Sequence, residues 1–121
     1  MTLLNNGKII DSVYKSFDVL LEKIVSYNSV FPSYKEHLKI FIKYRCDINH
    51  NLIKKNKIIF AAEFLNIDAI ILLKEYGYLE SIDNLKKAYD IAYQQSMSTR
   101  KIPFIKFIEK WINDLEPIDL T

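Results

Sequence analysis

Residues 61–77 read Ala-Ala-Glu-Phe-Leu-Asn-Ile-Asp-Ala-Ile-Ile-Leu-Leu-Lys-Glu-Tyr-Gly. Their apolar side chains recur at helical spacing, and Asn66 or Asp68 is suited to cap a helix by accepting a hydrogen bond from a free amide near its start. Gly77 is suited to end that helix, because a residue without a Cβ adopts the left-handed conformation without strain. The stretch therefore predicts two short helices, one over about 57–65 that Asn56 caps and one that ends at Tyr76 and Gly77.

Towards the N-terminus, the same spacing predicts two further helices. The first is a long helix over about 9–28, with a stripe formed by Ile10, Val13, Phe17, Leu20, Leu21 and Ile24. Pro32 interrupts this pattern, and Ser33 with Glu36 fits a capping box that starts the next helix. That second helix carries Leu38, Phe41 and Ile42, and a polar connector follows over 47–56.

Towards the C-terminus, two more helices are expected. Asp83 or Asn84 is suited to start a helix that continues to about Gln95. A polar link over 96–101 follows, and Pro103 suits the first turn of the last helix. Alternation of strand type is short wherever it occurs, and no Asn-Gly or Asp-Gly pair lies between two alternating segments. The chain is therefore predicted to form six helices in antiparallel pairs.

Composition excludes several classes of site. The 121 residues suit about one domain. The 2 glycines cannot build a glycine-rich phosphate loop, and the single cysteine excludes an internal disulfide or a multi-cysteine zinc site. The 2 histidines exclude a three-histidine metal centre, and a net charge of +2 is too small to indicate nucleic-acid binding. We expect neither a cofactor nor a metal.

The longest apolar runs, 58–62 and 69–73, are much shorter than a membrane span, which needs about 20 residues. The first residues lack the basic start and apolar stretch of a secretory signal. We therefore expect a cytoplasmic protein without a membrane partner, or a protein of the host cytoplasm if it is a viral protein or a bacterial effector.

Segments of the chain repeat. Residues 38–45 align with residues 70–77 at an offset of 32, with matching apolar positions and a matching tyrosine, and a third copy covers 105–110. In these residues the chain resembles the ankyrin repeat family. Residues 61–77 look like that family's inner helix, turn, outer helix and terminal glycine. Residues 45–49 are similar to the segment that opens an ankyrin finger, and 87–92 resemble the start of a final repeat.

The chain also departs from the ankyrin pattern. Residues 56–59 replace the Thr-Pro-Leu-His start, Leu65 replaces the glycine between the helices, and Arg45 stands where the outer-helix glycine belongs. Either these turns have changed shape, or the chain tolerates left-handed residues that are not glycine. An unrelated antiparallel helical bundle is the alternative, because apolar helical patterns match one another easily.

The resemblance implies an all-α fold, in which short antiparallel helix pairs stack as an ankyrin-like solenoid with a long N-terminal helix. The single domain would comprise an N-terminal capping helix over 1–32, degenerate repeats over 33–115 and a tail over 116–121. It further implies a non-catalytic protein–protein interaction module, an adaptor or inhibitor that binds a partner protein through finger loops and a concave inner-helix face. The implied partner-binding residues are Tyr44, Leu52, Ile53, Lys54, Lys55, Glu63, Phe64, Tyr76, Asp83, Asn84, Lys86, Gln94 and Gln95.

Two segments allow opposite interpretations. In 52–57, apolar Leu52 and Ile53 stand beside three lysines, so they either anchor a partner or lie under the neighbouring loop while the lysines are solvated. In the last helix, Phe104, Phe107 and Trp111 form an aromatic stripe beside the apolar one. This stripe is either a surface for self-association or part of a core that the inserted link allows the helix to bury.

The residues also allow two other functions. A nucleic-acid-binding helical protein would use the basic side chains Lys54, Lys55, Lys57, Lys86 and Lys87. A small enzyme would use His50 or Cys46, although a Cys–His pair needs spatial contact and a third orienting group. In the ankyrin alignment, Cys46 takes the place of a small buried alanine, which favours a packing role.

Overall fold

The computed structural model describes residues 7–116, with side chains from Ile10 onward. This part of the chain contains helices and connectors and no strand, so the prediction of an all-α fold is confirmed. The helices are α1 (Gly7–Val25), α2 (Pro32–Lys43), α3 (Lys57–Phe64), α4 (Ile67–Glu75), α5 (Ile82–Gln94) and α6 (Lys101–Leu115).

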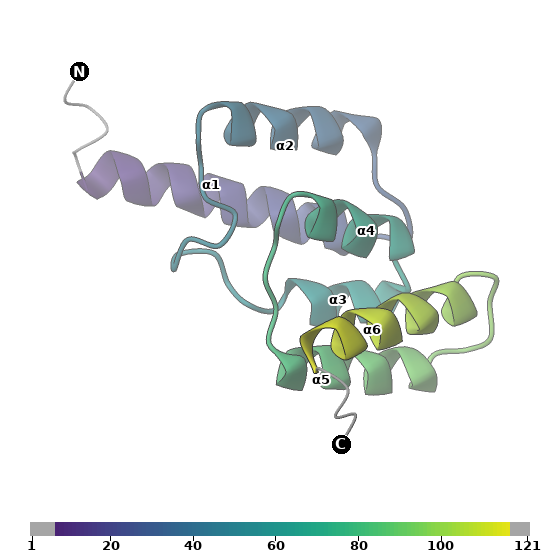
Figure 1. Ribbon diagram of the computed structural model, residues 1–121. Coiled ribbons are helices and arrows are strands. Elements are labelled where there is room, and N and C mark those ends of the chain that lie inside the picture. The colour runs from purple at the N-terminus through teal and green to yellow at the C-terminus, as the bar shows by residue number, and fades with distance from the viewer. Residues whose placement is uncertain (1–6, 117–121) are drawn as a thin grey trace.

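Consecutive helices form antiparallel pairs. In Figure 1, α1, α3 and α5 run in one direction, and α2, α4 and α6 return in the opposite direction. Helix α3 packs against both α1 and α5, while α4 packs against α6. The odd-numbered helices therefore form one layer and the even-numbered helices a second one.

Small side chains allow α3 and α5 to approach each other closely. Ala61 and Ala62 on α3 and Ala88 and Ala92 on α5 are fully buried. The stripe predicted for the first helix also enters the core, because Phe17, Leu20, Leu21 and Ile24 are buried while Ile10 and Val13 are half-buried.

Helix α1 ends at Val25, three residues before the predicted end. The Ser26 hydroxyl donates to the Glu22 carbonyl at 2.5 Å, and the Ser26 amide also donates to that carbonyl at 3.0 Å. The chain then bends, and the Tyr27 ring meets Phe31 edge-on at 5.4 Å. The helix therefore stops where the chain bends, short of the end that apolar spacing alone predicts.

Two helix starts differ from the prediction. Pro32 is the first residue of α2, where its fixed φ and missing N–H are favourable, so Ser33 already lies inside the helix and the predicted capping box is absent. Helix α5 begins at Ile82, because the Ser81 hydroxyl accepts from the Asn84 amide at 3.1 Å. The prediction that Asp83 or Asn84 caps this helix is therefore wrong.

The cap predictions for the central helices were partly right. Asn66 is the cap of α4, and its side chain accepts from the Ala69 amide at 3.1 Å. Asn56 occupies the cap position of α3, but its side-chain oxygen accepts from Lys57 Nζ at 3.1 Å instead of from the helix backbone. Pro103 lies in the first turn of α6, as predicted.

Three helices end in the same left-handed turn. Arg45, Leu65 and Gly77 have φ values of +63°, +50° and +82°. At each position the amide donates to the carbonyl three residues earlier, and the next amide donates to the carbonyl five residues before it, at distances of 2.9–3.3 Å. The chain therefore keeps the left-handed conformation at Arg45 and Leu65, although neither residue is glycine.

Helix α6 buries most of its two apolar stripes, although Leu115 at its end is 42% exposed. Phe104 and Ile108 are fully buried, and Trp111 is 4% exposed. Phe107 is half-buried and meets Trp111 edge-on at 6.2 Å. Of the two interpretations of the stripe formed by Phe104, Phe107 and Trp111, the burial of Phe104 and Trp111 supports the one that places it in the core.

Candidate functional site

The predicted partner-binding residues are divided between two ends of the helix layers (Figure 1). One end carries the α2–α3 and α4–α5 connectors, which we call the finger connectors (residues 44–56 and 76–81). The opposite end carries the last residues of α3 and α5, with Glu63, Phe64, Gln94 and Gln95. The predicted finger-loop residues and the predicted residues at the ends of α3 and α5 therefore form two separate candidate regions.

Asparagine side chains tie the finger connectors together. Asn49 Nδ2 donates to the Gly77 carbonyl at 2.9 Å, and its Oδ1 accepts from the Leu79 amide at 2.8 Å. Asn84 Nδ2 donates to the Lys55 carbonyl at 2.8 Å and to Glu80 Oε1 at 3.0 Å. The Nδ2 group of Asn84 is therefore occupied in fixing the connectors.

The apolar pair of the first connector has two different fates. Ile53 is 2% exposed and belongs to the core, because a turn in which its amide donates to the His50 carbonyl at 2.9 Å folds it inward. The prediction that Ile53 anchors a partner is wrong. Leu52 is 39% exposed and Lys54 is exposed, so both remain accessible.

The lysines within residues 54–57 do not form one basic patch. Lys57 is fully buried, and its Nζ lies 2.7 Å from Asp18 Oδ1 on α1. The same carboxylate oxygen accepts from the Lys54 amide at 3.0 Å. Lys55 Nζ lies 4.9 Å from the centre of the Tyr78 ring. Lys57 is therefore inaccessible to nucleic acid, and its prediction as a nucleic-acid contact is wrong. Asp18 and Lys57 are far apart in the sequence, so their spacing does not predict the ion pair.

A second buried polar group lies beside this ion pair. The Tyr78 hydroxyl is 3.4 Å from Glu80 Oε2, and Glu80 Oε1 accepts from the Ser81 amide at 3.0 Å. Burial raises the pKa of Tyr78 well above its ordinary value, and it also raises the pKa of Glu80. Both side chains therefore favour their protonated forms more strongly than solvated ones do.

His50 and Cys46 have local packing and hydrogen-bonding roles. The His50 ring stacks on Tyr14 at 3.7 Å, and its Nδ1 accepts from the Leu52 amide at 3.1 Å. Burial raises the pKa of the Cys46 thiol, the opposite of the shift that activates a nucleophilic cysteine. Within residues 7–116, no group of His, Cys, Asp and Glu side chains is placed to hold a metal ion.

At the opposite end, three connectors converge on a cavity of about 350 Å³, which we call the α3/α5 end cavity. The α1–α2 connector contributes one residue to the lining. The end of α3 and the turn after it contribute three, and the α5–α6 connector contributes the rest. Its lining consists of Asn28, Glu63, Phe64, Leu65, Gln95, Ser96, Met97, Ser98 and Arg100. The structure thus brings together the predicted residues Glu63, Phe64 and Gln95.

The α3/α5 end cavity combines exposed apolar side chains with an unsatisfied donor. Phe64 is 41% and Met97 is 73% exposed. Arg100 Nε is buried and has no hydrogen-bond partner in the described part of the chain. Gln95 Nε2 already donates to the Ile91 carbonyl at 3.0 Å. Met97 and Arg100 were not predicted, because the polar character of 96–101 indicates only a link.

The other predicted residues lie outside this cavity. Tyr44 is 74% exposed, and Asp83 and Gln94 are also exposed, whereas Tyr76 is half-buried. Lys86 is exposed and pairs with Glu116 at 2.9 Å.

Among residues 7–116, no helix combines the length and apolarity that crossing a membrane requires.

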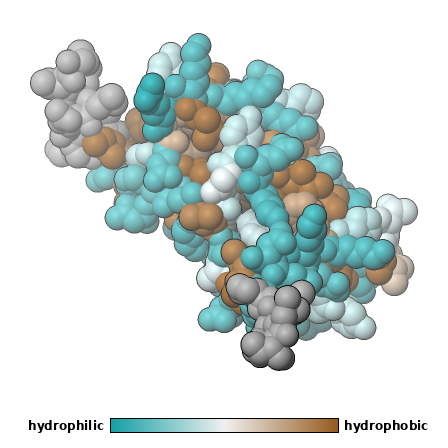
Figure 2. Space-filling model, viewed as in Figure 1, coloured by the Kyte–Doolittle hydropathy of each residue, from teal (hydrophilic) through white to brown (hydrophobic). Residues whose placement is uncertain are grey.

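On the face that Figure 2 shows, hydrophobic side chains form separate patches divided by hydrophilic ones. The comparisons with known proteins add no further constraint. No protein-family model, no curated protein and no solved structure matches this chain.

Proposed function

We propose that the chain is a divergent ankyrin-like module that binds a partner protein without catalysis, as an adaptor or inhibitor. Two observations support the ankyrin-like interpretation. The residues that end α2 and α4, Arg45 and Gly77, lie 32 positions apart and adopt the same left-handed turn. The helices also form consecutive antiparallel pairs whose inner members, α1, α3 and α5, contact one another in order.

The observation that carries the binding function is the α3/α5 end cavity. Phe64 and Met97 are exposed around it, and aromatic and methionine side chains supply adaptable apolar area at protein interfaces. Arg100 also lines the cavity and is half-buried, and an arginine guanidinium can donate hydrogen bonds to a partner's carbonyl or carboxylate. The fitting partner segment presents an apolar side chain next to a hydrogen-bond acceptor.

The finger connectors would make a smaller contribution. Tyr44, Leu52 and Lys54 are exposed there, and the hydrogen bonds of Asn49 and Asn84 fix the connectors before binding. A rigid surface binds with a smaller loss of conformational entropy than a flexible one. We therefore expect these residues to modulate the affinity that the α3/α5 end cavity provides.

Affinity purification from the organism that encodes the chain tests this proposal. The wild-type chain is compared with the double variant Phe64→Glu/Met97→Glu. The control is Ile71→Glu/Leu115→Glu, which changes two side chains that are 37% and 42% exposed on α4 and α6. Circular dichroism and thermal unfolding establish that all three proteins are folded.

We expect at least one protein to be enriched by the wild type and the control and to be depleted tenfold or more with the Phe64/Met97 variant. Binding of the purified partner should then show the same order of affinities. An equal set of captured proteins for the wild type and the Phe64/Met97 variant would refute the assignment of the cavity.

A further inference from the structure

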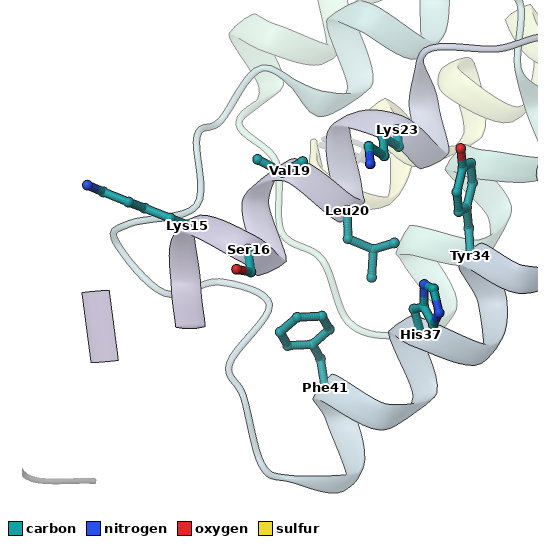
Figure 3. A pocket seen from close by; sticks show the side chains of 8 residues that line it. All are labelled: Lys15, Ser16, Val19, Leu20, Lys23, Tyr34, His37 and Phe41. Carbon is teal, nitrogen blue, oxygen red and sulfur yellow. The ribbon is translucent and has the colours of Figure 1, made fainter. Parts of the chain in front are cut away.

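A groove of about 470 Å³ runs between α1 and α2. We call it the α1–α2 groove, and Figure 3 shows the side chains that line it from both helices. Its lining consists of Lys15, Ser16, Val19, Leu20, Lys23, Tyr34, His37 and Phe41. None of these residues was predicted to bind a partner, and none belongs to the α3/α5 end cavity.

The floor of the groove is apolar and well packed. Leu20 is 6% exposed, and Phe41 stacks on the buried ring of Phe17 with 4.6 Å between centroids and 4° between planes. Val19 projects from α1 at the side of the groove and is 48% exposed. A preformed apolar floor with an exposed β-branched side chain beside it can accept apolar side chains from another segment.

The rim of the groove is basic. Lys15 and Lys23 lie about one helical turn before and after Val19, and His37 lines the groove from α2. No Asp or Glu is among the lining residues. Neither Lys15 nor Lys23 forms an ion pair within the described residues. The groove thus combines lysines that form no ion pair in the described residues with an apolar floor, and it complements an occupant that is acidic as well as apolar.

The position of the groove indicates the shape of its occupant. Only α1 and α2 line it, while other parts of α1 contact α3 and α4. The described residues contain no strand edge that an extended peptide could join. An additional helix, in contrast, can pack into a groove between two helices in the way that helices pack throughout this fold.

We propose that the α1–α2 groove binds an acidic amphipathic helix of a partner protein. From Lys15 to Lys23 the groove follows about 12 Å of α1, which is about two helical turns. A matching helix carries apolar residues at positions i, i+3 or i+4, and i+7, which contact Val19, Leu20 and Phe41. Asp or Glu residues beside this apolar stripe meet Lys15 and Lys23. This binding is independent of the function proposed for the α3/α5 end cavity.

Selection from a phage-displayed library of helix-stabilised peptides on the purified full chain tests the inference. The most enriched peptides are synthesised, and their Kd is measured by fluorescence anisotropy at low and high salt. The test variants are Val19→Glu and Lys15→Glu/Lys23→Glu. The matched control, Ile40→Glu/Lys43→Glu, changes an apolar and a basic residue that are exposed on α2 outside the groove lining.

We expect enriched peptides with an apolar stripe flanked by Asp and Glu. Each test variant should weaken their binding at least tenfold, whereas the control and Phe64→Glu/Met97→Glu should bind as the wild type does. Affinity should also fall as salt increases, because the charges at the rim are solvent-accessible.

Other occupants give different results. Enrichment of basic or proline-rich peptides, failure to enrich any peptide, or binding that survives Val19→Glu would refute the inference. A labelled RNA duplex is also tested. If it binds more tightly than the peptides and this binding is lost in Lys15→Glu/Lys23→Glu, the groove is a nucleic-acid surface and the inference of a partner helix is wrong. If sedimentation shows that the chain associates with itself and Val19→Glu abolishes this association, the occupant of the groove is a second copy of the chain and the inference of a partner helix is wrong.

Discussion

Replacement of Arg45 by glycine should stabilise the chain, although it removes a large side chain. Arg45 has a φ of +63°, and a left-handed conformation costs a residue with a Cβ about 1–2 kcal/mol. Glycine removes this cost, but it also gives the unfolded chain more conformational freedom. This freedom offsets about 0.4–1 kcal/mol of the stabilisation. The side chain is exposed and forms no ion pair in the described residues, so little else is lost. The expected net gain is about 0.5–1 kcal/mol.

The other two left-handed residues provide matched comparisons. A Cβ added at Gly77 meets nothing within 4 Å, so Gly77→Ala should cost only the conformational difference, about 0.5–1 kcal/mol. The Leu65 side chain is 5% exposed, and its removal costs about 1.5–3 kcal/mol of apolar burial. Leu65→Gly should therefore destabilise the chain, even though it relieves the same backbone conformation.

Urea and thermal denaturation followed by circular dichroism at 222 nm measure these differences. A change of 1 kcal/mol should shift the Tm by about 2–8 °C for a chain of this size. The expected order of stability is Arg45→Gly, wild type, Gly77→Ala and Leu65→Gly. If Arg45→Gly lowers the Tm as much as Gly77→Ala does, the left-handed turn at the end of α2 is not the source of strain, and the reasoning fails.

Further predictions concern polar side chains that form ion pairs or hydrogen bonds. Lys57→Met should cost about 3 kcal/mol because it leaves the Asp18 carboxylate without its cation, and Asp18→Leu/Lys57→Met should recover most of that loss in urea denaturation. Burial raises the pKa of Glu80, so the folded chain binds the proton of this carboxyl group more tightly than the unfolded chain does. The contribution of Glu80 to the free energy of unfolding therefore falls as the pH rises through the raised pKa. The stability of Glu80→Gln relative to wild type should therefore increase with pH. Tyr14→Phe removes the acceptor of the Asp47 amide at 2.8 Å and should cost about 1 kcal/mol by the same assay.

Local chemistry decides which segments are helical and how many helices form, so the sequence predicts both. Apolar spacing locates each helix, and the chemistry of Asn66, Gly77 and Pro103 acts within one or two turns of each residue. Where two local signals compete, the prediction is less accurate. Pro32 takes the first helical position ahead of the serine that fits a capping box, and Ser81 precedes the two residues that were expected to start α5.

The candidate sites depend on contacts between residues that are distant in sequence, so spacing predicts them only in part. Glu63 and Phe64 were predicted, but Arg100 becomes part of the same cavity only because α5 returns the chain to the end of α3. The burial of Ile53 likewise depends on how the connector folds. For the α1–α2 groove, the spacing of Lys15, Val19 and Lys23 at four-residue intervals was an available signal.

The central helix pair explains why α1 is an integral part of the fold. Helices α3 and α4 contain 8 and 9 residues, whereas an isolated helix shorter than about 12–15 residues is marginal in water. Two buried polar contacts join them to α1: the ion pair of Lys57 with Asp18 and the hydrogen bond from Asn66 Nδ2 to the Ile24 carbonyl at 2.9 Å. Both contacts require α1 to keep its position and register. The helix that lines the α1–α2 groove therefore also supports α3, the helix that presents Phe64 to the α3/α5 end cavity.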